Sequence, residues 1–176
     1  VEGCNLASIE IETGGNPIMK RNLVHNGSLC GVFVHDNGQG VFTSNDISDH
    51  VLAGVEIQTG GNPTMMNNKI HHGKSPKGVG VHDDGLGKGN GFLIHDHGEG
   101  MLENNEIYDN ASFGIEVAKN GKPTVRGSII KESGDSGVYV HDCGEGYFEN
   151  NKISCNKTAN VEVRSGANPK FRSNEI

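Results

Sequence analysis

Histidine–aspartate pairs are the residues of this chain best suited to chemistry. An imidazole beside a carboxylate can transfer protons or help to bind a metal ion. Three of the pairs precede Gly-x-Gly, in the segments VHDNGQG (34–40), IHDHGEG (94–100) and VHDCGEG (140–146). Asp84 directly follows the remaining pair. The pairs are His35-Asp36, His82-Asp83, His95-Asp96 and His141-Asp142.

A series of glutamates forms a second candidate set, consisting of Glu10, Glu56, Glu116 and Glu162. Cleavage of a glycosidic bond requires two carboxylates at a defined separation. These four are spaced by 46, 60 and 46 residues. We interpret that spacing as dispersal of like charge, and we expect no catalytic dyad.

The elements that must position these residues come from an internal repeat. When the first repeat position is placed at Ser8, the following repeats begin at Gly31, Gly54, Gly91, Gly114, Gly137 and Asn160, with spacings of 23, 23, 37, 23, 23 and 23 residues. Positions 2, 4, 12 and 17 are apolar throughout, and position 15 is Asn in every repeat except at Ser128. Such a period is typical of a solenoid.

The pattern within one repeat predicts short strands. Positions 2 and 4 are apolar and alternate with outward positions 3 and 5, as in a strand with one buried face. We therefore predict an all-β fold, a right-handed single-stranded parallel β-helix of about 7–8 coils with 23 residues per coil. The Asn column is expected to form a hydrogen-bonded ladder at a corner where the left-handed conformation is needed.

This geometry bears on the candidate residues. Coils with a complete His–Asp pair lie two steps, about 9.6 Å, apart, whereas a metal ion needs ligands within roughly 2.0–2.3 Å. Of the residues at position 5 between them, only Glu12 is a natural ligand. We expect no metal, no cofactor and no catalytic residue. The aspartates are expected to accept backbone N–H groups at turns.

Two kinds of coil alternate, one with Gly-Gly-Asn-Pro or a relative and one with His-Asp. The 37-residue spacing breaks this alternation, because residues 78–90 (GVGVHDDGLGKGN) resemble a partial His-Asp coil. We predict one domain over residues 1–176, with 78–90 as an insertion or truncated coil. His82, Asp83 and Asp84 lie in that segment.

Composition excludes several function classes. The net charge is −7 in 176 residues, which disfavours nucleic acid and anionic membranes. No apolar run approaches the roughly 18–20 residues of a membrane span. Four cysteines without a C-x-x-C pair predict reduced thiols and favour an intracellular location. The pattern runs through both ends, so we expect a piece of a longer chain.

The repeat phrases resemble a known family. The segments AGVEIQTGGNPTMMNNKIHHGKSPKGVGVHDDGLG (53–87) and GFLIHDHGEGMLENNEIYDNASFGIEV (91–117) are similar to the β-helix repeats of the F-box only protein eleven type. Related repeats occur in proteins grouped with carbohydrate-binding proteins and sugar hydrolases. The resemblance implies a right-handed β-helix that recruits protein substrates to a ubiquitin ligase.

Three functions remain open from the sequence. The first is a non-catalytic recognition scaffold for protein substrates, with an exposed column made of the His–Asp pairs and the four glutamates. The second is a carbohydrate-binding or carbohydrate-active protein. The third is a structural solenoid that associates through uncapped ends.

Overall fold

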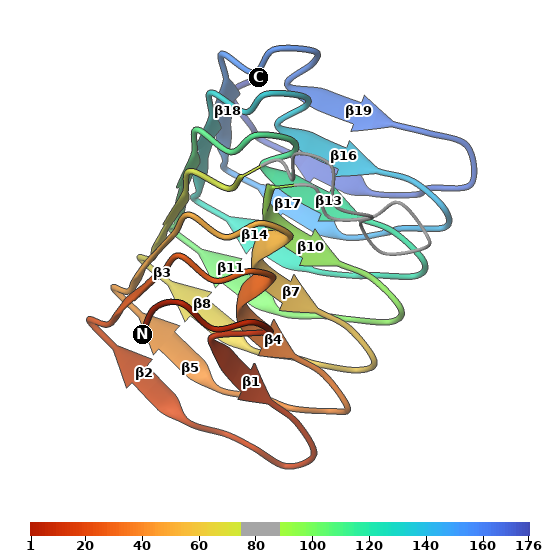
Figure 1. Ribbon diagram of the computed structural model, residues 1–176. Coiled ribbons are helices and arrows are strands. Elements are labelled where there is room, and N and C mark those ends of the chain that lie inside the picture. Colours follow the sequence, from red (N-terminus) through yellow and green to blue (C-terminus); the bar gives the residue numbers. More distant parts are fainter. Residues whose placement is uncertain (75–88) are drawn as a thin grey trace.

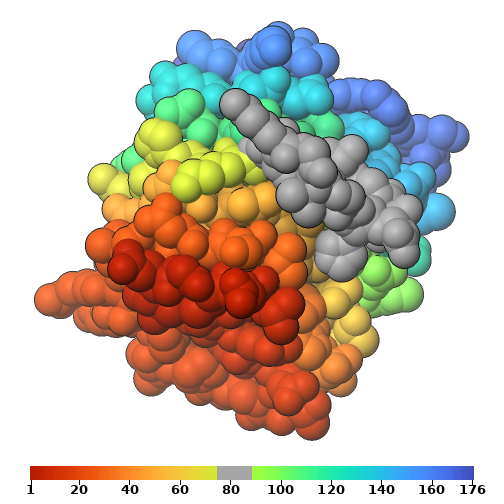
Figure 2. Space-filling model, in the orientation of Figure 1, coloured from red at the N-terminus to blue at the C-terminus, as the bar shows by residue number. Residues whose placement is uncertain are grey.

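The computed structural model describes residues 1–74 and 89–176, and it is a parallel β-solenoid (Figure 1). The described residues form twenty short strands and no helix. The described residues wind through seven coils, and strands of successive coils pair in parallel. The successive colours of Figure 2 show the coils stacked from one end of the molecule to the other. The predicted all-β parallel solenoid is therefore confirmed.

Three sheets run along the stack. Sheet 1 contains β1 (Ile9–Ile11), β4 (Cys30–Val34), β7 (Ala53–Ile57), β10 (Asn90–Ile94), β13 (Ile115–Val117), β16 (Val138–Val140) and β19 (Val161–Val163). Sheet 2 contains β2 (Ile18–Lys20), β5 (Val41–Thr43), β8 (Thr64–Met66), β11 (Met101–Glu103), β14 (Thr124–Arg126), β17 (Tyr147–Glu149) and β20 (Lys170–Arg172). Sheet 3 contains β3 (Leu23–His25), β6 (Asp46–Ser48), β9 (Lys69–His71), β12 (Glu106–Tyr108), β15 (Ile129–Lys131) and β18 (Lys152–Ser154).

The pairing register reproduces the repeat. Val32 pairs with Val55, and Val55 pairs in turn with Phe92 across the 37-residue spacing. The coil that begins at Gly91 therefore stacks directly on the coil that begins at Gly54. Asn90 pairs with Ala53 as the first residue of β10, so residue 90 belongs to the stack and not to the expected insertion. Residues 78–88 of that insertion lie outside the described residues.

The interior is a narrow column of apolar side chains. Val32, Val34, Phe42 and Ile47, at repeat positions 2, 4, 12 and 17, are all completely or almost completely buried. Burial of one such side chain contributes about 1.5–3 kcal/mol. Because each coil covers the next, four apolar positions per coil suffice for a continuous core.

The Asn column forms the expected ladder. The side-chain carbonyl of Asn68 accepts hydrogen bonds from the backbone N–H and the side-chain amide of Asn45, at 2.9 and 3.0 Å. The Asn68 amide donates to Phe42 O and to Asn105 Oδ1. Ser128 keeps the ladder continuous, since its hydroxyl accepts from the Asn105 backbone N–H.

The left-handed corner lies one residue before the ladder. Position 14 has positive φ in every coil, for example 55° at Asn67 and 54° at Asn104. The ladder asparagines are not among the residues with positive φ. The left-handed residue therefore lies one position earlier than the predicted Asn column.

The four cysteines are free, as expected. Cys30 is buried, while Cys143 and Cys155 are exposed. In the described part of the chain, no helix is long and apolar enough to cross a membrane.

Candidate functional site

The outer face of sheet 1 brings the predicted glutamates and histidines together. Positions 3 and 5 of a coil both point away from the core, because side chains alternate along a strand. A glutamate at position 3 of one coil reaches a histidine at position 5 of the next. The Nε2–Oε1 distances are 3.1 Å for His35–Glu10, 3.1 Å for His95–Glu56 and 2.9 Å for His141–Glu116.

The aspartate of each pair contacts the other ring nitrogen. His Nδ1 lies 3.0 Å from Asp36 Oδ2, 2.6 Å from Asp96 Oδ2 and 2.9 Å from Asp142 Oδ2 in the three coils. Each aspartate has a left-handed backbone, with φ between 43° and 46°. The observed partner of these carboxylates is the imidazole, and not a backbone N–H group as predicted. We call each Glu–His–Asp set a triad.

Three of the glutamates, Glu56, Glu116 and Glu162, also have a donor at the second carboxylate oxygen. Cys30 Sγ donates to Glu56 Oε2 at 2.7 Å, and Asn90 Nδ2 donates to Glu116 Oε2 at 2.5 Å. Ser136 Oγ donates to Glu162 Oε2 at 2.8 Å, and Arg164 Nε donates to its other oxygen at 2.9 Å. Cys30, Asn90 and Ser136 each stand directly before position 1 of a coil, and each bonds to the glutamate of the next coil. Arg164 lies in the same coil as Glu162. The carboxylates are thus held from two coils.

The triads favour charged histidines. A carboxylate can only accept hydrogen bonds, so a ring that faces carboxylates at both nitrogens is best served as imidazolium. Burial by itself lowers the pKa of His95, but its hydrogen bonds and charge interactions with Glu56 and Asp96 outweigh this effect and raise the pKa. The same balance raises the pKa of His35 and His141.

The triads differ from the exposed column that the sequence predicted. Glu56 and Glu116 are each 3 % exposed, His95 is 5 % exposed and His141 is 9 % exposed. The expectation of a solvent-facing column is therefore wrong for these four side chains, which are engaged with one another between coils. His82, Asp83 and Asp84 lie outside the described residues.

The other predicted site residues range from partly buried to exposed, with the His35 side chain 13 % exposed. The side chains of Glu10, Asp36, Asp96 and Asp142 are about half exposed or more. Glu162 is partly buried. The sequence-based expectation of an accessible surface therefore holds for the aspartates and the first glutamate, but these are the outer ends of the triads.

One triad borders a further acidic group. Ligand atoms of Glu12, His35 and Asp36 lie within 4.8 Å of one another. Glu12 is the residue that the sequence analysis singled out as a natural metal ligand. His35 Nε2 is engaged by Glu10, so this cluster has one imidazole that is already fully hydrogen-bonded.

A groove on the outer side of sheet 2 was missed by the sequence analysis. It has a volume of about 350 Å³, which is within the range of ligand sites. Its lining comes from four successive turns and from strand residues that follow them: Glu99, Lys122, Pro123, Thr124, Glu145, Gly146, Tyr147, Asn168 and Lys170. We call this the sheet 2 groove.

The groove combines an aromatic ring with groups of both charges. Lys122 Nζ lies 2.9 Å from Glu145 Oε2, and Asn62 Nδ2 donates to Glu99 Oε2 at 3.3 Å. The Tyr147 hydroxyl donates to Glu149 at 3.1 Å. The only sequence signal for this groove is weak: repeat position 9 is polar in all seven coils, but its residue type changes from coil to coil.

A second hollow of about 310 Å³ lies on the outer side of sheet 1, beside the first triad. Its lining includes Glu10, Phe33 and Glu56, together with Leu6, Leu29 and Leu52. Phe33 stacks on His35 with the ring centroids 4.2 Å apart. This hollow is the more apolar of the two, and one of its carboxylates is the buried Glu56.

Comparison with known proteins shows the fold family. A family model described as "Right handed beta helix region" matches residues 1–87 and 87–176. A search of curated proteins found no match. The solved structure titled "Crystal Structure of the periplasmic alginate epimerase AlgG" is similar, with a TM-score of 0.80 and 14 % sequence identity. The match covers 97 % of this chain and 42 % of that chain.

The comparisons define what is shared. At 14 % identity the likeness to the epimerase concerns the fold, and this chain spans less than half the length of that structure. The family model and the structural match agree with the predicted right-handed β-helix. They do not show the F-box only protein eleven type that the repeat phrases suggested.

Proposed function

The chain belongs to the right-handed β-helix family, and from this we propose that it binds a carbohydrate polymer along the sheet 2 groove. The observation that carries the proposal is the lining of the groove, where Tyr147 lies among acidic, amide and amine side chains. Sugar rings offer hydroxyls that both donate and accept hydrogen bonds, and C–H faces that pack on aromatic rings. The groove supplies a partner for each of these features.

The direction of the groove suits a linear polymer. Glu99, Lys122 and Glu145 stand at the same position of three successive coils, and successive coils are about 4.8 Å apart. A chain of sugar rings that runs along the stack would therefore meet a new polar side chain at each coil.

The charges favour a neutral sugar. Glu99 and Glu145 balance Lys122 and Lys170 within the groove, whereas the whole chain carries −7. A polyanion would gain nothing from the groove and would be repelled by the rest of the surface.

Binding fits the groove better than catalysis. Glu145 is paired with Lys122 and Glu99 accepts from Asn62, so each carboxylate already has a partner within the groove. The remaining acceptor positions of both glutamates can accept sugar hydroxyls.

The comparisons favour a carbohydrate over a protein substrate. The similar solved structure is named as an alginate epimerase, which is a carbohydrate-active protein. The F-box ubiquitin ligase role that the repeat phrases implied has no support in the comparisons. We therefore place the carbohydrate hypothesis ahead of the recognition scaffold.

The test is calorimetric titration of the chain with neutral cello- and xylo-oligosaccharides and with alginate oligosaccharides. We expect a neutral oligosaccharide to bind, and Tyr147→Thr to weaken its affinity at least about tenfold, or about 1.4 kcal/mol. Threonine is chosen because Thr124 stands at the same position one coil earlier, so the variant should keep the strand.

The control is Tyr108→Ala, which removes an aromatic ring from sheet 3 and should leave saccharide affinity unchanged. The proposal fails if no saccharide binds at millimolar concentration, or if Tyr147→Thr binds as the unmodified chain does. Tighter binding of alginate than of neutral sugars would overturn the charge argument.

A further inference from the structure

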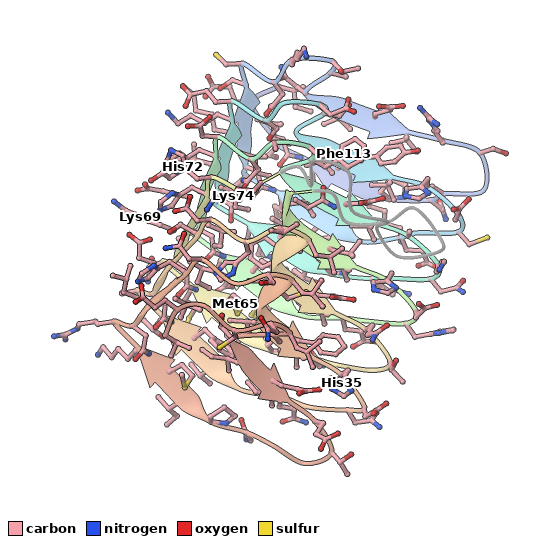
Figure 3. All side chains as sticks on the ribbon, viewed as in Figure 1. His35, Met65, Lys69, His72, Lys74 and Phe113 are labelled. Atoms are coloured by element: carbon pink, nitrogen blue, oxygen red, sulfur yellow. The ribbon has the colours of Figure 1, made fainter. Side chains whose placement is uncertain are left out.

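Two adjacent histidines on sheet 3 form a cluster outside the groove and the triads. His71 ends β9 and His72 follows it at a second left-handed position of the coil, repeat position 19, with φ of 54°. Figure 3 places His72 with Lys69 and Lys74 along one edge of the stack, away from His35. His71 is partly buried and the His72 side chain is about half exposed.

The outer nitrogen of each ring is held by a carboxylate from a neighbouring coil. His71 Nε2 lies 3.0 Å from Asp46 Oδ1 of β6, on one side of β9. His72 Nε2 lies 3.0 Å from Asp109 Oδ2, directly after β12 on the other side. A carboxylate that accepts from Nε2–H leaves Nδ1 without a proton in a neutral imidazole.

The two Nδ1 atoms face each other, 2.5 Å apart. With both Nε2 atoms donating to carboxylates, two lone pairs would meet at this point. Such an arrangement is favourable only when a cation lies between them, either a proton or a metal ion. Imidazole nitrogens backed by carboxylates are the usual arrangement of histidine metal ligands.

The surroundings favour a cation and fix the rings. Tyr108, the cross-strand partner of His71, stacks on its ring with centroids 4.7 Å apart and an interplanar angle of 9°. Asp49 is the third acidic side chain nearby and is paired with Lys74 at 3.3 Å. Asp46 and Asp109 therefore supply two negative charges beside the pair.

We propose that His71 and His72 bind one divalent transition-metal ion through their Nδ1 atoms, with Asp46 and Asp109 as positioning residues and solvent completing the coordination. Imidazole ligands select Zn²⁺, Ni²⁺ or Cu²⁺ over Mg²⁺ and Ca²⁺. A tetrahedral ion with bonds of about 2.0–2.1 Å separates two ligand nitrogens by roughly 3.3 Å. The exposed His72 ring therefore moves outward slightly on binding.

The experiment titrates Zn²⁺ into the chain by calorimetry, in a Cys143→Ser, Cys155→Ser background that removes the exposed thiols. We expect one ion per chain and no competition from Mg²⁺ or Ca²⁺. His71→Ser and His72→Asn copy residues found at the same positions of other coils, Ser48 and Asn26, so both should fold. Each is expected to lower Zn²⁺ affinity at least about tenfold, and Asp46→Asn about tenfold.

The matched control is His25→Ser, at the same repeat position as His71 two coils away, which should leave the affinity unchanged. Thermal melting of each variant without metal checks that the fold is retained. The proposal is overturned if Zn²⁺ does not bind, or if His72→Asn binds as tightly as its parent. If Zn²⁺ does not bind, the contact between the two Nδ1 atoms is explained by a proton shared between the rings.

Discussion

At the residue scale, the triads show how charge is managed on a strongly acidic chain. Glu56 and Glu116 are buried, and an isolated buried carboxylate is costly. His95 and His141 compensate them from the next coil, while Asp96 and Asp142 hold the other ring nitrogen. The triads therefore link successive coils, and this stabilisation depends on the imidazolium form of each histidine.

We predict that His95→Gln makes the fold less stable and less dependent on pH. Glutamine occupies the same position at Gln58 but cannot compensate the charge of Glu56. At pH 6 the free energy of unfolding should fall by about 3 kcal/mol, as for other broken buried pairs. Guanidinium unfolding at pH 6 and pH 9 measures both effects.

The sign of the pH effect follows from the raised pKa of His95. Its stabilisation is complete below the ordinary histidine pKa of about 6.5 and is lost as pH rises through the higher pKa of the folded state. The difference between the two chains should therefore shrink by pH 9. Burial lowers the pKa of His50, but His50 is present in both chains and cancels. The exposed His97 provides the control, since His97→Asn should change the free energy of unfolding little. If His95→Gln lowered the free energy of unfolding equally at pH 6 and pH 9, the prediction would be contradicted.

At the element scale, the strands could be predicted because each coil repeats the same inward positions. Val32, Val55 and Phe92 are apolar at position 2, and they pair with one another in the structure. The Asn ladder was predictable for the same reason, since a residue type that recurs with the coil must stack on itself. The direct pairing of β7 with β10 followed from the phase of the repeat on either side of the irregular segment.

The contacts of the candidate residues could not be predicted from the repeat alone, because they join different repeat positions of neighbouring coils. The repeat places Glu56 in one column with Glu116, and His95 in another with His141. The structure instead joins position 3 of one coil to position 5 of the next, as in Glu56–His95. His71 was missed for a related reason, because its partner Asp46 stands two repeat positions earlier. His72 and Asp109 share one repeat position in successive coils, but the residue type at that position changes from coil to coil.

We predict that Asn68→Ala lowers the free energy of unfolding by about 3 kcal/mol. The change removes the two hydrogen bonds that the Asn68 amide donates and the two that its carbonyl accepts from Asn45. It leaves the buried backbone N–H of Asn45 without a partner, and an unsatisfied buried group costs about 1–3 kcal/mol. Asn68→Ser should lose less, because Ser128 already serves in the ladder. Denaturant unfolding measures both variants. Asn67→Ser, at the neighbouring exposed residue, is the control. If the ladder contributed little, all three variants would have the same free energy of unfolding.

At the scale of the whole molecule, stacking makes every coil depend on its neighbours. An interior coil is covered on both sides, and its inward residues such as Val55 and Phe92 are completely buried. The terminal strands have one partner each, since β1 pairs only with β4 and β19 only with β16. Val163, at an inward position of β19, is consequently 46 % exposed.

We predict that this 176-residue chain associates end to end as its concentration rises. An edge strand offers unpaired backbone groups to another strand, and the last coil adds the exposed apolar side chain of Val163. Light scattering across a dilution series should show a mass that increases with concentration.

Val163→Lys should reduce this association, because a charge on an edge strand opposes pairing. Ile129→Lys places the same charge on an exposed apolar residue in the middle of the stack and should leave association unchanged. A single mass at all concentrations would show that the exposed edges do not pair, and an equal effect of the two lysines would assign the association to the sides of the stack instead of its ends.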